Sequence, residues 1–138
     1  MSRKDTFHDV VRRSLEKDGW TITHDPLKLR YELGNLYVDL GAEKILTAER
    51  EGQKIAVEVK SFLQNSAVSE FHSALGQFIS YRTLLDEQYP DYVLYLAVPR
   101  DIYTSFFASQ FVQNIINSQQ LKLLIYRPAQ EVIDRWLN

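Results

Sequence analysis

The sequence contains no cysteine. Disulfide bonds and thiolate-bound metal centres are therefore excluded, and this absence suits the reducing conditions of a cytoplasm. The chain also lacks any run of 18 apolar residues, and its first residues, MSRKDTFHDV, place Asp5 and Asp9 where a signal peptide would need an apolar segment. We therefore expect a cytoplasmic protein that has no membrane partner.

An excess of basic residues is missing as well. The 16 Lys and Arg residues are outnumbered by 18 Asp and Glu residues, which gives a net charge of −2. General attraction to phosphate is thus not the dominant property, and any binding of nucleic acid must depend on local positive charge. With 45% hydrophobic and 25% charged residues, and only five Gly and four Pro in 138 residues, the composition is that of one globular domain spanning residues 1–138.

Hydrophobic periodicity predicts the order of helices and strands. We expect helices over residues 5–18, 68–88, 101–117 and 128–136, and strands over residues 20–23, 36–41, 45–48, 54–62, 92–98 and 121–126. The strands over residues 36–41, 45–48 and 54–62 are predicted to pair as an antiparallel meander. Antiparallel strands early and strand-helix-strand units late predict an α/β fold, with a mixed central sheet flanked by helices.

Two charged residues interrupt the apolar strand IAVEVKSF, at Glu58 and Lys60. They are two residues apart and must point to the same face of the strand. Asp39 lies in the earlier apolar segment YVDLGAE, and on the expected meander the three side chains form one cluster. Oxygen ligands of this kind suit Mg²⁺, and a nearby lysine can orient a water molecule or offset charge in a transition state. The alternative is a structural pair in which Lys60 contacts Asp39 or Glu58 across the sheet.

This pattern of residues resembles a known superfamily of nucleases. Asp39, followed after nineteen residues by Glu58-Val59-Lys60 on strands behind an opening helix, is similar to the PD-(D/E)XK superfamily, which has a restriction endonuclease-like α-β-β-β-α-β core. The segments YVDLGAEKILTAER, KIAVEVKSF, FHSALGQFISYR and YLAVP together resemble the XisH family, the excision-controlling factors of the fdxN element. Val38 stands where the superfamily motif has its proline.

The resemblance implies roles for individual residues. Asp39 and Glu58 would bind Mg²⁺ or Mn²⁺, the Val59 carbonyl would be a possible third ligand, and Lys60 would be the catalytic lysine.

Gln77 and Tyr81 match the Q-x-x-x-Y pattern of some RecB-like nucleases. Because residues four apart share a helix face, this pair either reaches the site or forms a satisfied pair at the border of the apolar stripe.

One position departs from the pattern of related nucleases, which usually carry a glutamate on the first helix. His8 occupies that position. A neutral histidine can bind a metal, although it is a softer ligand than Mg²⁺ prefers, and a partly buried structural histidine is the alternative. Glu16 is rotated by roughly 80° from His8 on the helix and does not replace the missing ligand.

Two functions remain open at this point. The first is a metal-dependent DNA endonuclease, or DNA-processing subunit, that hydrolyses phosphodiesters during excision of a genomic element. The second is a non-catalytic accessory protein that keeps the nuclease fold and binds a recombinase or another partner protein. We expect DNA as a partner, a protein of the excision system as a possible second partner, and a homodimer.

Overall fold

The structure is a computed structural model. It describes residues 5–33, 36–39 and 45–138, with the backbone alone for residues 33 and 36–39.

The chain forms four α-helices, one 3-10 helix and eight strands within these residues. They are α1 (His8–Lys17), β1 (Thr21–His24), β2 (Arg30–Leu33), β3 (Leu36–Asp39), β4 (Ile45–Arg50), β5 (Gln53–Val59), α2 (Ala67–Gln88), β6 (Val93–Pro99), α3 (Arg100–Thr104), η2 (Phe106–Ala108), α4 (Gln110–Gln119), β7 (Leu123–Arg127) and β8 (Val132–Leu137). None of these described helices combines the length and apolar composition needed to cross a bilayer.

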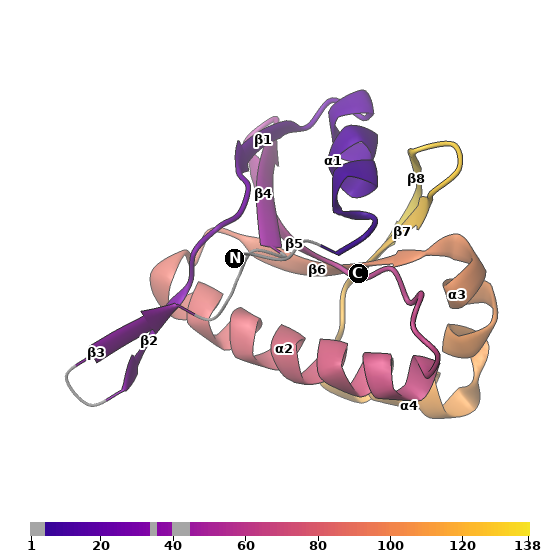
Figure 1. Cartoon of the computed structure of the whole chain (residues 1–138). Coiled ribbons are helices and arrows are strands. Elements are labelled where there is room, and N and C mark those ends of the chain that lie inside the picture. The colour runs from indigo at the N-terminus through magenta and orange to yellow at the C-terminus, as the bar shows by residue number, and fades with distance from the viewer. Residues whose placement is uncertain (1–4, 34–35, 40–44) are drawn as a thin grey trace.

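Six of the strands form one mixed sheet, in the order β1-β4-β5-β6-β7-β8. The central strands β5, β6 and β7 are parallel, whereas β1, β4 and β8 join with antiparallel pairing. In Figure 1, α1 lies on one face of this sheet, and α2 and α4 lie on the other. The predicted α/β fold with a mixed central sheet flanked by helices is therefore confirmed.

The sheet separates two hydrophobic cores because successive strand residues point to opposite faces. Val57 and Val59 of β5 pack in the core beneath α1. Ala56 of the same strand packs in the core beneath α2, with Phe71 and Phe78 of that helix. Both cores contain large side chains that are fully buried, so each face of the sheet is closed by its own helical layer.

The expected antiparallel meander is wrong in its first strand. Strands β4 and β5 pair as predicted, but β3 pairs with β2 in a separate two-stranded sheet, in which Asp39 lies opposite Arg30. Figure 1 shows this ribbon projecting beyond the main sheet. The edge of β4 that the meander assigned to residues 36–41 is paired with β1 instead. The local pattern of hydrophobic residues does not show which of two segments, residues 21–24 or residues 36–41, pairs with this edge of β4.

The single helix expected over residues 101–117 is also wrong. The chain forms α3, η2 and α4 in succession, with breaks at Ser105 and Ser109. The Ser109 side chain accepts a hydrogen bond from the Val112 amide at 3.4 Å and caps α4. Serine stabilises helix starts by this contact, so Ser109 favours the start of a new helix despite the helical spacing of the aromatic residues. Phe107 is fully buried at this break.

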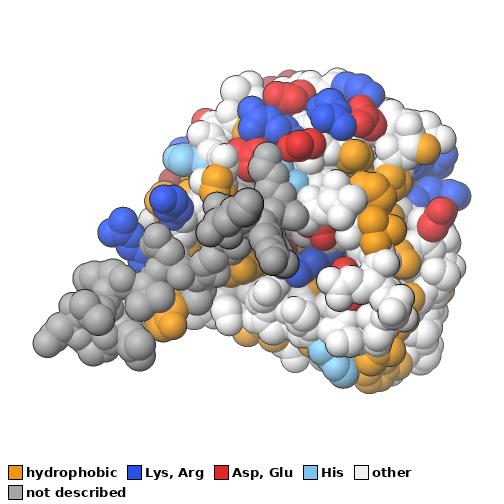
Figure 2. All heavy atoms as spheres, viewed as in Figure 1, with side chains coloured by type: hydrophobic (Ala, Val, Ile, Leu, Met, Phe, Trp, Pro, Cys, Tyr) orange, Lys and Arg blue, Asp and Glu red, His pale blue; other side chains and the backbone are white. Residues whose placement is uncertain are grey.

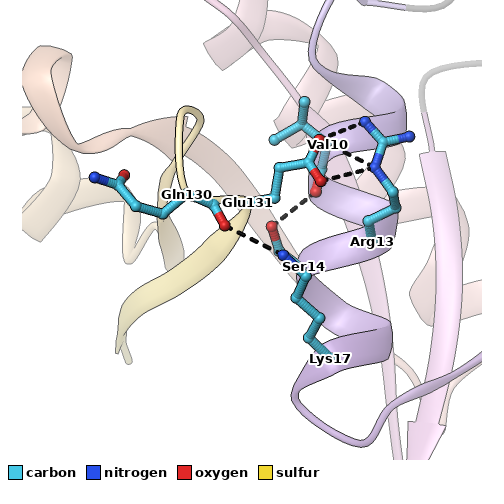
Figure 3. A network of polar contacts seen from close by, with 6 residues as sticks. All are labelled: Val10, Arg13, Ser14, Lys17, Gln130 and Glu131. Carbon is cyan, nitrogen blue, oxygen red and sulfur yellow. Dashed lines mark hydrogen bonds and ion pairs between the residues drawn. The ribbon is translucent and has the colours of Figure 1, made fainter.

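The closing helix expected over residues 128–136 is a strand. Residues Val132–Leu137 form β8, antiparallel to β7, and Trp136 packs at 4.9 Å from the ring of Tyr95 on β6. The β-branched and aromatic residues of this segment favour pleated structure once β7 offers an edge to pair with. The preceding turn lies against α1, where Glu131 faces Arg13 (Figure 3).

Candidate functional site

Glu58 and Lys60 lie together at the carboxyl end of β5. Glu58 follows Ala56 on the side of the sheet that α2 covers, and its neighbours in register are Ile45 on β4 and Leu96 on β6. Glu58 is fully buried and Lys60 is 4% exposed. The Lys60 Nζ atom lies 4.0 Å from Glu58 Oε2. The prediction that the two charges share one face is therefore confirmed.

Burial of these two charges has a cost in hydration. Two charges removed from water lose their hydration, and only short, well-directed contacts repay that loss. A separation of 4.0 Å exceeds the 2.7–2.9 Å of a strong charge-assisted hydrogen bond by about 1 Å. The Glu58 carboxylate and the Lys60 ammonium therefore lie close to each other without forming a short direct hydrogen bond.

The backbone of Lys60 is fixed by two long-range hydrogen bonds. Its amide donates to the Ala97 carbonyl at 3.0 Å, and its carbonyl accepts from the Tyr126 hydroxyl at 3.0 Å. Tyr126 is fully buried. Burial raises the pKa of its phenol far above the ordinary value, with smaller contributions from the negative charges of Asp5 and Glu70, so the hydroxyl stays a donor at neutral pH.

The residues after Lys60 are held by the segment before α1. Asp5 Oδ2 accepts a hydrogen bond from the Ser61 amide at 2.9 Å, while Asp5 Oδ1 accepts one from the Phe7 amide at 2.9 Å. Sequence reasoning missed the roles of both Tyr126 and Asp5. Neither belongs to a recognisable motif, and each acts over more than 50 residues of chain, so only the assembled fold shows the contact.

Gln77 and Tyr81 lie on the face of α2 that is turned toward the sheet. Tyr81 is 3% exposed and belongs to the core that also contains Ala56. Gln77 is partly buried, and its Oε1 atom is enclosed without a hydrogen-bond partner among the described residues. Both side chains therefore enter the same layer as Glu58. Their role in a site stays a prediction.

His8 has a definite structural partner. Its Nε2 lies 2.5 Å from Asp25 Oδ1, and Arg12 Nη1 donates to Asp25 Oδ2 at 2.8 Å. His8 is fully buried, and the Asp25 side chain is 6% exposed. These contacts support the structural alternative for His8, because the ring nitrogen Nε2 is already engaged by a carboxylate. A metal role for His8 would have to use Nδ1, which is enclosed without a hydrogen-bond partner among the described residues.

The metal ligands expected from the sequence are only partly placed. The side chain of Asp39 lies outside the described residues, and its strand β3 is not a neighbour of β5. Over residues 5–32 and 45–138, no three His, Asp or Glu side chains gather closely enough to hold one ion. Glu58 supplies a carboxylate of the kind that Mg²⁺ accepts. The described residues thus fit one part of an oxygen donor set, and the metal roles of Asp39, Val59 and His8 stay predictions.

A pocket opens at the carboxyl ends of the parallel strands, next to the residues that follow Lys60. Its volume is about 480 Å³, and it is bounded by residues 61–63 after β5, residues 99–102 at the end of β6, residues 127–130 at the end of β7, and Phe7. Crevices at this edge of a parallel sheet are a common place for ligands in α/β proteins.

The comparison with known proteins decides the family. The family model described as XisH protein matches residues 1–134. The chain belongs to the XisH family. No curated protein matches it.

Two solved structures are similar to this chain over nearly its whole length. One is an XisH family protein from Nostoc punctiforme PCC 73102, with 54% identity, a TM-score of 0.87, and coverage of 97% of this chain and 100% of that one. The other is an fdxN element excision controlling factor protein from Anabaena variabilis, with 53% identity, a TM-score of 0.86, and coverage of 96% and 98%. The family expected from the sequence motifs is therefore confirmed.

Proposed function

We propose that this XisH protein controls excision of a genomic DNA element by hydrolysing phosphodiester bonds in DNA, with a divalent metal ion as cofactor. The protein from Anabaena variabilis, 53% identical, is described as an excision controlling factor of the fdxN element, which supports the biological role. The observation that supports the chemistry is the buried Glu58 carboxylate with Lys60 Nζ 4.0 Å away. A fold of the PD-(D/E)XK type is part of this proposal.

Each residue has a separate task in the proposed reaction. Glu58 and Asp39 hold the ion, with the Val59 carbonyl as a further oxygen donor. A bound Mg²⁺ or Mn²⁺ lowers the pKa of water and stabilises negative charge on a phosphoryl oxygen. Lys60 orients the attacking water and offsets the charge that develops on the phosphate. Tyr126 keeps the Lys60 backbone in place, which fixes where the ammonium group can reach.

Glu58→Gln and Lys60→Met test the proposal directly. Purified protein is incubated with supercoiled plasmid and with single-stranded DNA in Mn²⁺, and cleavage is followed on gels. We expect each variant, and Asp39→Asn, to lose at least about 100-fold in rate, because each removes a ligand or a charge from the transition state. Glu87→Gln is the matched control, since Glu87 is exposed at the end of α2. Thermal melting shows whether each variant is folded.

The second candidate, a non-catalytic accessory protein, predicts a different result. Wild-type protein would then leave every DNA intact in Mn²⁺, and calorimetry would detect no Mn²⁺ binding. The engagement of His8 by Asp25, where related nucleases carry a glutamate, is the observation that favours this candidate. A folded wild-type protein with neither property would overturn the nuclease proposal.

A further inference from the structure

The pocket beside Lys60 combines apolar surface with charge. Its apolar lining comes from the start of α1 and from the three loops at the strand ends, and consists of Phe7, Phe62, Leu63, Ile102 and Pro128. Leu63 is 60% exposed, so it contributes apolar surface that solvent can reach. Figure 2 shows hydrophobic side chains gathered on this side of the molecule, between the position of α1 and that of the β7–β8 hairpin in Figure 1.

Two arginines stand at the rim of the pocket. Arg127 Nε donates to Asp134 Oδ1 at 2.7 Å, and Arg100 Nε lies 3.8 Å from the same atom. The side chains of Arg127 and Arg100 are 43% and 46% exposed. Asp134 thus accepts a hydrogen bond from Arg127 Nε and forms a longer ion pair with Arg100 Nε. A guanidinium presented in this way suits a phosphate, which it can bind in a bidentate manner.

The backbone at Phe62 is strained. Its φ angle is 55°, a left-handed conformation that aromatic residues rarely adopt. Such residues concentrate at functional sites, where the surrounding structure imposes the conformation. Here the imposing contacts are those on both sides of Phe62: Lys60 is bound by Tyr126, and the ring of Phe62 packs edge-on against Phe107 at 5.4 Å. Phe62 borders the pocket two residues after Lys60, and at 6% exposure it belongs largely to the core.

From these observations we infer that the pocket receives an unpaired nucleobase of a bound DNA strand, with Arg100 and Arg127 binding phosphates of the same strand. This inference rests on the proposed function and specifies its substrate class, which is DNA with single-stranded nucleotides and not continuous duplex. A base inside a duplex is stacked and cannot enter a pocket without being extruded, whereas an unpaired base gains contact with apolar and aromatic side chains.

The one acidic residue among the described lining residues fits a base as well. Asp101 lies beside Arg100 in the pocket. A carboxylate repels phosphate, but it accepts hydrogen bonds from the exocyclic amino groups of cytosine and adenine. The volume of about 480 Å³ lies within the range of about 300–1,000 Å³ that is usual for small-molecule sites.

Binding of fluorescent oligonucleotides by anisotropy, in EDTA and at fixed ionic strength, tests the inference apart from cleavage. Three probes of one sequence are compared: a single strand, a duplex, and a single strand with abasic positions in its centre. We expect the single strand to bind at least about tenfold more tightly than either of the others, because base contacts and not phosphates alone supply the affinity.

Leu63→Asp should weaken binding of the single strand at least about tenfold and weaken binding of the duplex much less, because it replaces apolar lining that only an unpaired base contacts. Phe111→Asp is the matched control, since Phe111 is a similarly exposed apolar residue, 54% exposed, on α4. Three results would each overturn the inference that the pocket receives a base. They are equal affinity for single strand and duplex, equal affinity for the intact and the abasic single strand, and unchanged binding by Leu63→Asp.

The two proposals fail in different ways. If Mn²⁺-dependent nicking occurs but duplex and single strand bind alike, the nuclease proposal stands and the base pocket is wrong. If the single strand is bound selectively but no DNA is cut in Mn²⁺, the pocket stands and the hydrolytic chemistry is wrong.

Discussion

The hydroxyl of Tyr126 on β7 donates a hydrogen bond to the backbone carbonyl of Lys60 across 66 residues of chain, at 3.0 Å. Both residues are almost completely buried. The bond therefore joins the third parallel strand to the end of the first, beyond the intervening strand β6. It connects the stability of the sheet to the position of the candidate catalytic lysine.

Tyr126→Phe removes this donor and leaves the Lys60 carbonyl enclosed without it. We expect the free energy of unfolding to fall by about 1–3 kcal/mol, the usual cost of a buried polar group that loses its partner. Urea denaturation followed by circular dichroism measures the change. Tyr95→Phe is the control, because the Tyr95 hydroxyl bonds to Asn138 at an exposed position. A loss no larger than that of the control would show that the Tyr126 hydroxyl adds nothing to stability.

The same hydroxyl predicts a loss of stability at alkaline pH. Burial raises the pKa of Tyr126 above the value near 10 that it has in the unfolded chain. The unfolded state therefore releases its proton first, and the stabilisation present below pH 10 decreases as the pH rises beyond it. Unfolding free energies measured between pH 8 and about pH 11 should decline more steeply for wild type than for Tyr126→Phe. If the unfolding free energies of wild type and Tyr126→Phe declined in parallel with pH, the Tyr126 hydroxyl would not be the cause of the decline.

Much of the fold could be predicted from the sequence because its signals are local. The helix expected over residues 68–88 is observed at Ala67–Gln88, and the strand expected over residues 92–98 is observed at Val93–Pro99. The helix predicted over residues 128–136 is wrong, and Val132–Leu137 is a strand, since its pattern of apolar residues fits either structure. Only the free edge of β7 decides between them, and that edge exists only in the assembled sheet.

The candidate site, like the fold, could be predicted only where it depends on local sequence. The spacing of Glu58 and Lys60 was enough to place both on one face of β5, because strand alternation is a local property. The contacts of Tyr126 and Asp5 with the chain around Lys60 could not be predicted, since they depend on which distant segments the fold brings together. The partner of His8 was missed for the same reason: Asp25 is 17 residues away and marks only a turn in the sequence.

A second pH dependence comes from the ion pair between α1 and the turn before β8. Figure 3 shows Arg13 facing the Glu131 carboxylate, which accepts from Arg13 Nε at 3.0 Å and from Nη2 at 2.5 Å. The hydrogen bond and charge of Arg13 lower the pKa of Glu131 below its value in the unfolded chain. The stabilisation is thus present above the unfolded pKa and is lost as the pH falls through the folded pKa.

Glu131→Gln tests this by urea denaturation at several pH values. The variant should be less stable than wild type at pH 7, and the difference should shrink as the pH falls below the ordinary glutamate pKa of about 4.3. Added salt should also reduce it, because the pair is exposed. Glu16→Gln is a control on α1, the helix that carries Arg13. Glu16 has only a 3.8 Å contact to Arg12. A difference independent of pH would show that the carboxylate charge is not the cause.

The buried pair of Glu58 and Lys60 allows structure and chemistry to be separated. Glu58→Gln or Lys60→Met alone removes one member of a buried pair of opposite charges 4.0 Å apart, and should cost about 3–5 kcal/mol in unfolding free energy. The double variant contains no charge at either position and should regain most of that loss, which a double-mutant cycle measures. Activity should not return with stability if the two groups serve a reaction. A stable double variant that still cuts DNA in Mn²⁺ would show that these charges are structural only.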